Sequence, residues 1–373
     1  MMEKGPRLQS LDIFRGITIA SMILVNTPGD WEHIYAPLEH SKWNGCTPTD
    51  LVFPSFLFMV GVSIVYALQK KRPEKAMHGN ILLSAFRRML LLIGIGLAIQ
   101  LFYRFDFHHL RFPGVLQRIG VVYFISTVLY LKFSGRVLNY GIAVALVGYY
   151  IIMTFVPVPD GYLPNLEPAT NMAAYIDRLV FTTDHMYKST KLWDPVGLLS
   201  TIPAIATTLF GIKAGTWLKR PDIAGPDKTV WLLVAGICAI VAGLTVDLFF
   251  PINKALWTSS YVLYAAGICT LGLTITYWLV DIKQYGKNLW PFLVFGTNAI
   301  SAYVLSEIVP GLINLIKINI GNHTVSGMKL LYSQVFLPIL APRTASLLSA
   351  ICFVLFIWLL MYPLYRKRVF IKL

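Results

Sequence analysis

Charge is scarce in this sequence. Of its 373 residues only 13% are charged, whereas soluble globular domains average about 25%. The shortfall is mainly acidic, since 18 acidic residues accompany 32 basic ones and leave a formal charge of +14. Hydrophobic residues make up 56% of the chain, and the mean hydropathy is +0.63. This composition excludes a soluble protein of such length and predicts an all-α, polytopic membrane helical bundle.

Cysteine is also scarce, and the four residues lack the spacing of a metal site, so we expect no bound metal. A cleavable signal peptide is absent too. The first apolar run contains Asp12 and Arg15, and no small-residue cleavage site follows it, so we expect the run to remain in the membrane. No repeat and no low-complexity tract divides the chain. We therefore expect a single domain over residues 1–373.

Ten apolar runs are long enough to cross a membrane, which takes roughly 20 residues. They occupy about 10–27, 50–69, 85–103, 114–132, 138–156, 196–217, 229–250, 257–280, 289–309 and 345–365. With the N-terminus inside, the inner connecting segments hold twice as many basic residues as the outer ones. The positive-inside rule then predicts a multi-pass protein of the inner (cytoplasmic) membrane with both termini cytoplasmic. The same distribution explains the basic charge without a nucleic-acid partner.

Two outer segments connect these runs. Segment 157–194 is rich in proline and aromatic residues, which predicts an ordered lid or wall because a flexible linker would be richer in Gly and Ser. Segment 310–344 is compatible with a short eleventh hydrophobic element or with a re-entrant piece, and the sequence leaves both open.

A polar loop between the first two runs holds the best candidate for chemistry. It contains His33, Glu39, His40, Trp43 and Asn44. A histidine side chain takes up and releases a proton near neutral pH, which is what a general base needs. Judged by itself, His40 is better interpreted as a solvated loop residue.

The residues that flank this loop each have a structural and a chemical interpretation. Thr47 and Asp50 fit a capping box at the start of the second run, and Asp50 is also placed to orient His40. Asn26, at the end of the first run, is either a helix cap or a donor to a developing oxyanion.

Charges within the runs allow two interpretations as well. Asp12 and Arg15 share a helix face, as an interior ion pair or as part of a functional path. Arg118 is able to bind a carbonyl or carboxylate, or to hold acidic partners in the bundle. A basic inner patch either fixes topology or binds the phosphates of an acyl-CoA. Its members are Lys70, Lys71, Arg72, Arg87 and Arg88.

Several motifs resemble those of the heparan-α-glucosaminide N-acetyltransferases and their bacterial relatives. The main match is HSKWNGCTPTDLVFPSFLFMVG, preceded by SLDIFRGITIASMILVN. Further matches are PGVLQRIGVVYF at 113–124, DPVGLLSTIPA at 194–204, PINKALWTSSYVLYAAG at 251–267 and, more weakly, FGTNAISAY at 295–303. The resemblance implies that His40, in the pattern H-x-x-W-N-G, is the catalytic histidine. It also implies that the lumenal N-terminal domain of the animal enzymes has no counterpart here.

The favoured interpretation is a membrane-embedded acetyltransferase that uses cytoplasmic acetyl-CoA and acetylates a hexosamine or glycan-end amine on the outer face. His40, Asn26 and Asp50 are then the catalytic candidates. Donor binding is expected at Arg118, Ser259, Ser260, Asn298, Arg87 and Arg88. Acceptor binding is expected at Trp43, Asn44 and Asp194. Direct transfer and an acetyl-histidine route both stay open, and so does a homodimer.

The alternative is a permease for a sugar or amino sugar, because ten spans and intramembrane charges suit that class equally. No pair of matching interrupted helices in two halves supports it. Co-purification of CoA with the protein would favour the enzyme.

Overall fold

The computed structural model describes residues 8–103, 105–320 and 323–371. Regular structure in these residues is helical apart from one antiparallel hairpin, formed by β1 (Lys317–Ile320) and β2 (His323–Ser326). The predicted helical membrane bundle is therefore confirmed. The chain groups into two compact units built from interleaved segments, described separately below. Whether the whole chain acts as one domain stays a prediction.

Seven helices are long and apolar enough to cross a membrane within the described residues, and a bent pair makes a possible eighth. The seven are Pro48–Leu68, Lys75–Tyr103, Val115–Lys132, Gly135–Phe155, Gly225–Asp247, Ser259–Ile282 and Pro342–Arg366. The bent pair is Tyr285–Thr297 with Ala299–Asn314, at an angle of 68°. The two remaining predicted spans are helices α1 (Gln9–Asn26) and α7 (Thr201–Leu218). Both are less apolar, because α1 carries Asp12 and Arg15 while α7 carries Lys213 and several threonines.

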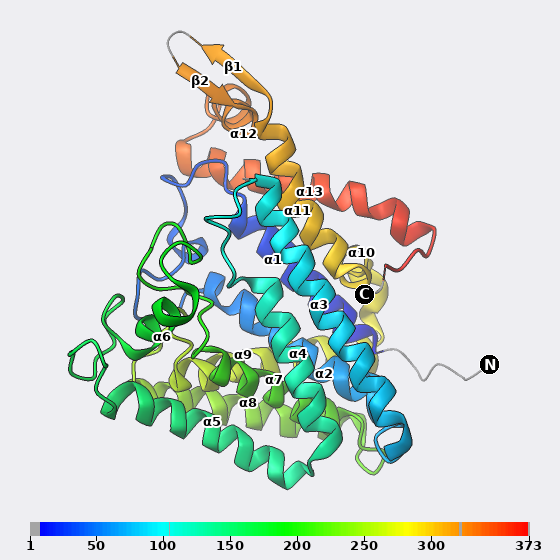
Figure 1. Ribbon diagram of the computed structural model, residues 1–373. Coiled ribbons are helices and arrows are strands. Elements are labelled where there is room, and N and C mark those ends of the chain that lie inside the picture. Colours follow the sequence, from blue (N-terminus) through cyan, green and yellow to red (C-terminus); the bar gives the residue numbers. More distant parts are fainter. Residues whose placement is uncertain (1–7, 104, 321–322, 372–373) are drawn as a thin grey trace. The chain divides into compact units, whose positions relative to one another are not determined.

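The first unit consists of Met1–His40, Thr47–Val52 and Ile275–Lys372. Its α1 packs closely on α10 (Trp290–Thr297). The two backbones meet at Gly16, where a Cβ would overlap the carbonyl of Phe292. Glycine allows such backbone contact between membrane helices. Helix α11 (Ala299–Asn314) leads to the β-hairpin (Figure 1), and α13 (Pro342–Arg366) packs against α1 and α10.

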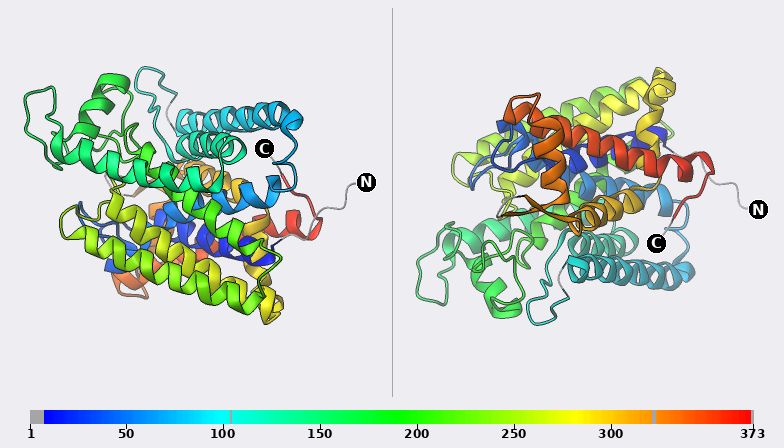
Figure 2. Two further views of the ribbon diagram at one scale, coloured as in Figure 1. Left: turned by 90° about the horizontal axis from the view of Figure 1, so that it is seen from below. Right: turned by 90° about the horizontal axis from the view of Figure 1, so that it is seen from above.

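The second unit consists of Ser41–Cys46 and Phe53–Thr274. Its longer helices are α2 (Val52–Leu68), α3 (His78–Tyr103), α4 (Val115–Lys132), α5 (Gly135–Phe155), α8 (Gly225–Asp247) and α9 (Ser259–Tyr277). Helices α3 and α4 run side by side in every view (Figure 2). Helix α7 packs against α4, α5 and α8, and its Gly211 lies against the backbone of Phe58 in α2. Trp257, Tyr261 and Tyr149 are among the fully buried side chains.

The two long connecting segments, 157–194 and 310–344, differ in what they contain. Segment 157–194 includes the amphipathic helix α6 (Met172–Phe181), which buries Met172, Ala173, Ala174 and Asp177. This agrees with the ordered lid or wall expected there. Segment 310–344 contains the end of α11, the hairpin, α12 (Gly327–Leu331) and the short helical turn η6 (Tyr332–Phe336). The helical pieces α12 and η6 are both too short to cross a membrane. Among the described residues the segment therefore contributes no further spanning helix beyond the seven or eight candidates, so the short eleventh element is not a full span.

Candidate functional site

His40 lies at the end of the first unit's loop and pairs with a buried aspartate. Its Nδ1 is 2.7 Å from Oδ1 of Asp50. The imidazole is 50% exposed, whereas the Asp50 side chain is 1% exposed. If Nδ1 carries the proton and donates it to Asp50, Nε2 holds the lone pair that can accept a proton. This is the arrangement of a general base with an orienting carboxylate.

Asp50 also forms the capping box expected from the sequence. The backbone N–H of Thr47 donates to Oδ2 of Asp50 at 3.0 Å, and the side chain of Thr47 accepts from the backbone N–H of Asp50. The box starts the helical turn η2 (Pro48–Leu51), which continues into α2. One carboxylate therefore has both roles considered for it, with one oxygen for the helix start and the other for His40.

Asn26 is the last residue of α1 and is exposed, while Thr27 is the C-cap residue. The amide of Asn26 is thus not the cap itself. Its role as an oxyanion donor stays a prediction.

The other residues of the H-x-x-W-N-G motif belong to the second unit, where two aromatic rings and two amides meet. Trp43 packs edge-on against Trp193 with ring centres 4.9 Å apart, and its indole N–H donates to the carbonyl of Leu166. The side-chain amide of Asn253 donates to Oδ1 of Asn44 at 3.1 Å. Asn44 is exposed and Trp43 is partly exposed. Partly exposed tryptophan rings and amides suit a sugar, and the predicted acceptor role of both residues stays a prediction.

Arg118, in α4, is buried with unused hydrogen-bond donors. Its Nη2 donates to the carbonyl of Gly197 at 2.8 Å and to the hydroxyl of Ser200 at 2.5 Å. The guanidinium lies 5.2 Å from the ring centre of Trp257. In the part of the chain that the structure describes, Nε and Nη1 have no hydrogen-bond partner. A buried guanidinium in this state fits an incoming oxygen atom, such as that of a carbonyl or phosphate.

Asp194, predicted to bind the acceptor, is fully engaged within the fold. Arg111 donates to both of its oxygens, at 2.8 and 2.6 Å, and the backbone amides of Tyr187 and Val196 donate as well. The carboxylate is 0% exposed. A bidentate pair of this kind anchors the end of segment 157–194. Binding of an acceptor by Asp194 stays a prediction.

Asp177 in α6 is a second buried carboxylate of the same region, and the sequence analysis did not select it. Its Oδ1 accepts the backbone N–H of Leu198 at 2.8 Å. Burial raises the pKa of Asp177 to about 7, and the negative charge of Asp194 adds to this, while the amides of Leu198 and Asp194 and the charge of Arg118 oppose it. The signal in the sequence was a single acid on the apolar face of an otherwise amphipathic helix, at helical spacing from Ala173 and Ala174.

Most of the remaining donor candidates contact neighbouring parts of the chain. The hydroxyl of Ser259 donates to the carbonyl of Leu146, and Ser260 bonds to Thr258. The side chain of Asn298, at the break between α10 and α11, bonds to the backbone of Val369 and Ile371 in the tail. Arg87 is exposed on α3, and Arg88 lies over the ring of Tyr123. Their donor-binding roles stay predictions. Asn298 belongs to the first unit. The second unit contains the other four, Ser259, Ser260, Arg87 and Arg88.

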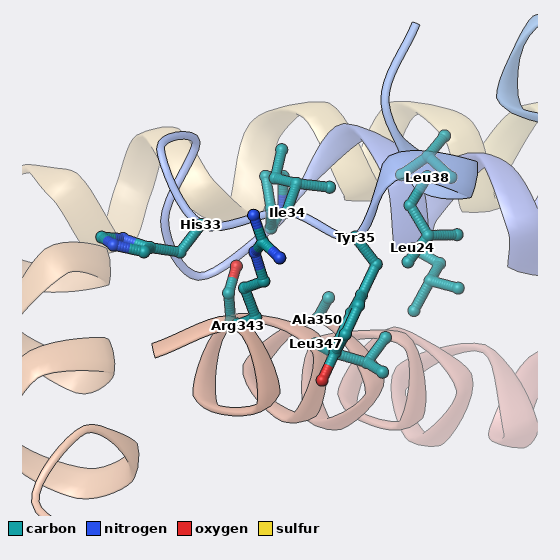
Figure 3. A pocket seen from close by; sticks show the side chains of 11 residues that line it. Leu24, His33, Ile34, Tyr35, Leu38, Arg343, Leu347 and Ala350 are labelled. Carbon is teal, nitrogen blue, oxygen red and sulfur yellow. The ribbon is translucent and has the colours of Figure 1, made fainter. Parts of the chain in front are cut away.

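The first unit also has a hollow between the loop after α1 and helix α13 (Figure 3). Its polar lining residues include His33, Tyr35 and Arg343, and apolar residues such as Leu24 and Leu347 line the rest. No candidate catalytic or binding residue from the sequence analysis lines it. It is therefore a poor candidate for the site of the chemistry.

Comparison with known proteins identifies a family and relatives in mammals. The family described as heparan-alpha-glucosaminide N-acetyltransferase, catalytic, matches residues 7–238. The human heparan-alpha-glucosaminide N-acetyltransferase is 31% identical over 360 residues, which cover 81% of this chain and 53% of the human protein. The mouse protein of that name is 32% identical over 366 residues, which cover 81% of this chain and 54% of the mouse protein. The chain thus spans about half the length of the curated relatives it matches.

Proposed function

Because this chain belongs to the heparan-α-glucosaminide N-acetyltransferase catalytic family, we propose that it transfers an acetyl group from acetyl-CoA to an amine. The observation that carries the proposal is the His40–Asp50 pair, which stands at the motif that the family resemblance singles out. The names of the relatives point to a glucosaminide acceptor for those proteins. For this chain we propose the amine of a hexosamine or of a glycan end.

His40 acts in this proposal as the general base. As the amine nitrogen attacks the thioester carbonyl, Nε2 takes the proton that the nitrogen loses. The new C–N bond forms and the C–S bond breaks, and the imidazolium returns the proton to the departing thiolate. Asp50 stabilises the imidazolium and keeps the ring oriented, because its own position is held by the capping box. An acetyl-histidine intermediate uses the same pair with Nε2 as nucleophile.

Arg118 is our candidate for binding an oxygen of the donor. Its Nε and Nη1 are buried and unpartnered among the described residues, so an oxygen bound there regains hydrogen bonds that the guanidinium otherwise lacks. Either the thioester carbonyl or a phosphate oxygen is compatible with this geometry. Asn26 is the alternative donor to the developing oxyanion.

The orientation that we propose follows from the basic residues. Both termini lie in the cytoplasm and the His40 loop faces outward, which makes the donor cytoplasmic and the acceptor external. Acetyl groups then cross the inner membrane during the reaction.

Acetyl transfer by the purified full-length protein tests the proposal. The protein is incubated with acetyl-CoA and a panel of amino sugars that includes glucosamine, and products are identified by mass spectrometry. We expect an N-acetylated product and free CoA with the wild type and much less with His40→Ala. A folded wild-type protein that acetylates no amine, but carries amino sugars unchanged across vesicle membranes, would make the permease the correct interpretation.

A further inference from the structure

Three hydrogen bonds of the second unit converge on the carbonyl oxygen of Gly197. Nη2 of Arg118 donates to it at 2.8 Å, the hydroxyl of Ser200 at 3.0 Å and the hydroxyl of Thr201 at 3.1 Å. This oxygen and the Ser200 hydroxyl, to which Nη2 also donates at 2.5 Å, therefore together position the guanidinium of Arg118.

The other edge of the same peptide group is held by Asp177. The carbonyl of Gly197 and the N–H of Leu198 belong to one planar trans peptide, so they point in opposite directions. Oδ1 of Asp177 accepts that N–H at 2.8 Å. A carboxylate and a guanidinium thus bind the two ends of a single peptide group, and each polarises it in the sense that strengthens the other bond.

Glycine at 197 permits this arrangement. A Cβ at this position would overlap the carboxylate of Asp177, so the side chain lies directly against the peptide that it holds. Asp177 is 1% exposed and is fixed by α6, whose N-cap residue Asn171 accepts the N–H of Ala174 at 2.9 Å.

The peptide group also separates the two side chains. No ion pair joins Asp177 and Arg118 in the described residues, although the two side chains share one peptide. A direct ion pair would occupy donors of the guanidinium. The intervening peptide instead fixes Nη2 and leaves Nε and Nη1 unpartnered within the described structure.

We propose that Asp177 is the positioning residue for Arg118 and acts through the Gly197–Leu198 peptide group. The outer segment 157–194 thereby controls the orientation of a donor-binding guanidinium in α4. The inference rests on the role proposed above for Arg118, but the hold of Asp177 on the peptide can be measured without any activity.

Hydrogen exchange followed by mass spectrometry on the full-length protein tests that hold. Asp177→Ala removes the acceptor of the Leu198 N–H, so amides in segment 194–201 should exchange about tenfold faster, as for a lost hydrogen bond. Asp177→Asn keeps an acceptor oxygen and should stay near the wild type. Asp160→Ala is the matched control, because Asp160 lies in the same outer segment but is exposed and pairs with Arg178. If Asp177→Ala does not fold, Asp177→Leu fills the same space without an acceptor.

Acetyl transfer by the same variants tests the consequence for Arg118. Asp177→Ala should lower transfer about tenfold, Asp177→Asn should restore most of it, and Asp160→Ala should change it little. In an Arg118→Gln background Asp177→Ala should cause no further loss, because both changes remove the same interaction.

The two measurements separate the possible failures. Unchanged exchange in Asp177→Ala overturns the inference whatever the activity. The inference is also overturned if Asp177→Ala exchanges faster but still lowers acetyl transfer further in the Arg118→Gln background. The loss of transfer would then come from general damage to the fold and not from Arg118. Faster exchange in a protein whose wild type acetylates no amine supports the hold of Asp177 on the peptide and removes only the proposed function.

Discussion

The two histidines of the loop after α1 each pair with an aspartate, with nearly equal geometry. His40 and Asp50 are 2.7 Å apart, and His33 and Asp30 are 2.6 Å apart. The aspartates differ. Asp50 is buried and anchored by a helix start, whereas the Asp30 side chain is 30% exposed, and its hydrogen bond from His33 lowers its pKa. A carboxylate anchored by a helix start fixes the orientation of its histidine better than a more exposed one does, so we expect the first pair and not the second to serve catalysis.

Replacement of His40 by alanine should lower acetyl transfer by about 10²-fold or more, which is typical for loss of a positioned general base. The protein should remain folded because the imidazole is half exposed. CoA binding, measured by calorimetry, should persist. Steady-state transfer kinetics of the purified variant check the loss.

His33→Ala is the control for this change, because it removes the other loop histidine and its aspartate contact. We expect near-normal transfer. Equal losses in both variants, or near-normal turnover of His40→Ala, would remove His40 from the mechanism and leave Glu39 and Asp50 as candidates for the base.

Asp177 should make the stability of the protein depend on pH. Its pKa is 3.8 in the unfolded chain and about 7 in the fold, so the folded state binds the extra proton between these values. This stabilisation is full below about pH 4 and is lost as the pH rises through 7. The slope is at most about 1.4 kcal/mol per pH unit. The charges facing the carboxyl group, those of Arg118 and Asp194, already contribute to its pKa.

Thermal unfolding of the wild type and Asp177→Asn in detergent checks this dependence. The variant lacks the titrating group, so its Tm relative to the wild type should rise by several degrees between about pH 4.5 and pH 8. A difference that is constant with pH would show that Asp177 ionises in the fold as it does in the unfolded chain.

At the scale of the helices, the close approach of α2 and α7 depends on glycine. A Cβ at Gly211 would overlap the carbonyl of Phe58, which is backbone and cannot rotate away. Gly211→Ala should therefore destabilise the protein by about 2 kcal/mol, as overpacking does. Thermal unfolding in detergent measures the loss as a lower Tm.

Gly148→Ala is the matched control in α5, because nothing lies within 4 Å of a Cβ at that position. Alanine favours the helix there by up to about 1 kcal/mol, so the Tm should hold or rise. An equal fall in both variants would argue against close packing as the cause.

Hydropathy predicted the positions of the helices well, because the length of a span follows from the thickness of the bilayer. It did not predict the bend of 68° between α10 and α11, where one apolar run at 289–309 continues through Asn298. Nor did it predict the hairpin in segment 310–344, since four-residue strands carry no periodic signal of their own.

The sequence predicted those contacts of the candidate site that join residues close together in the chain, and it missed those that join distant ones. The capping box and the His40–Asp50 pair involve residues at most ten apart. By contrast, the contact of Asp177 with Leu198 spans 21 positions, and that of Arg118 with Ser200 spans 82. Local spacing does not reveal such pairs, so Asp177 was missed and the partners of Arg118 were left open.

For the whole molecule, the orientation in the membrane decides the direction of transfer. We predict that Lys42 lies outside and Lys71 inside. Each position is changed to cysteine in a chain without the native Cys46, Cys238, Cys269 and Cys352. An impermeant thiol reagent on intact cells should then label position 42 only.

Permeabilised cells provide the control, because both positions should be labelled there. Labelling of position 71 but not 42 in intact cells would reverse the topology. The acetyl donor would then have to be supplied on the opposite face.

The shared carboxylate of Asp50 limits how this protein can be re-engineered. One oxygen serves the first turn leading into α2 and the other serves His40, so the base cannot be shifted along the loop without a new anchor. An Asn at this position offers one oxygen and one NH2 group, and it can reproduce only one of the two contacts faithfully. A redesign for a different acceptor should therefore leave residues 40 and 47–50 intact and vary the surrounding loop.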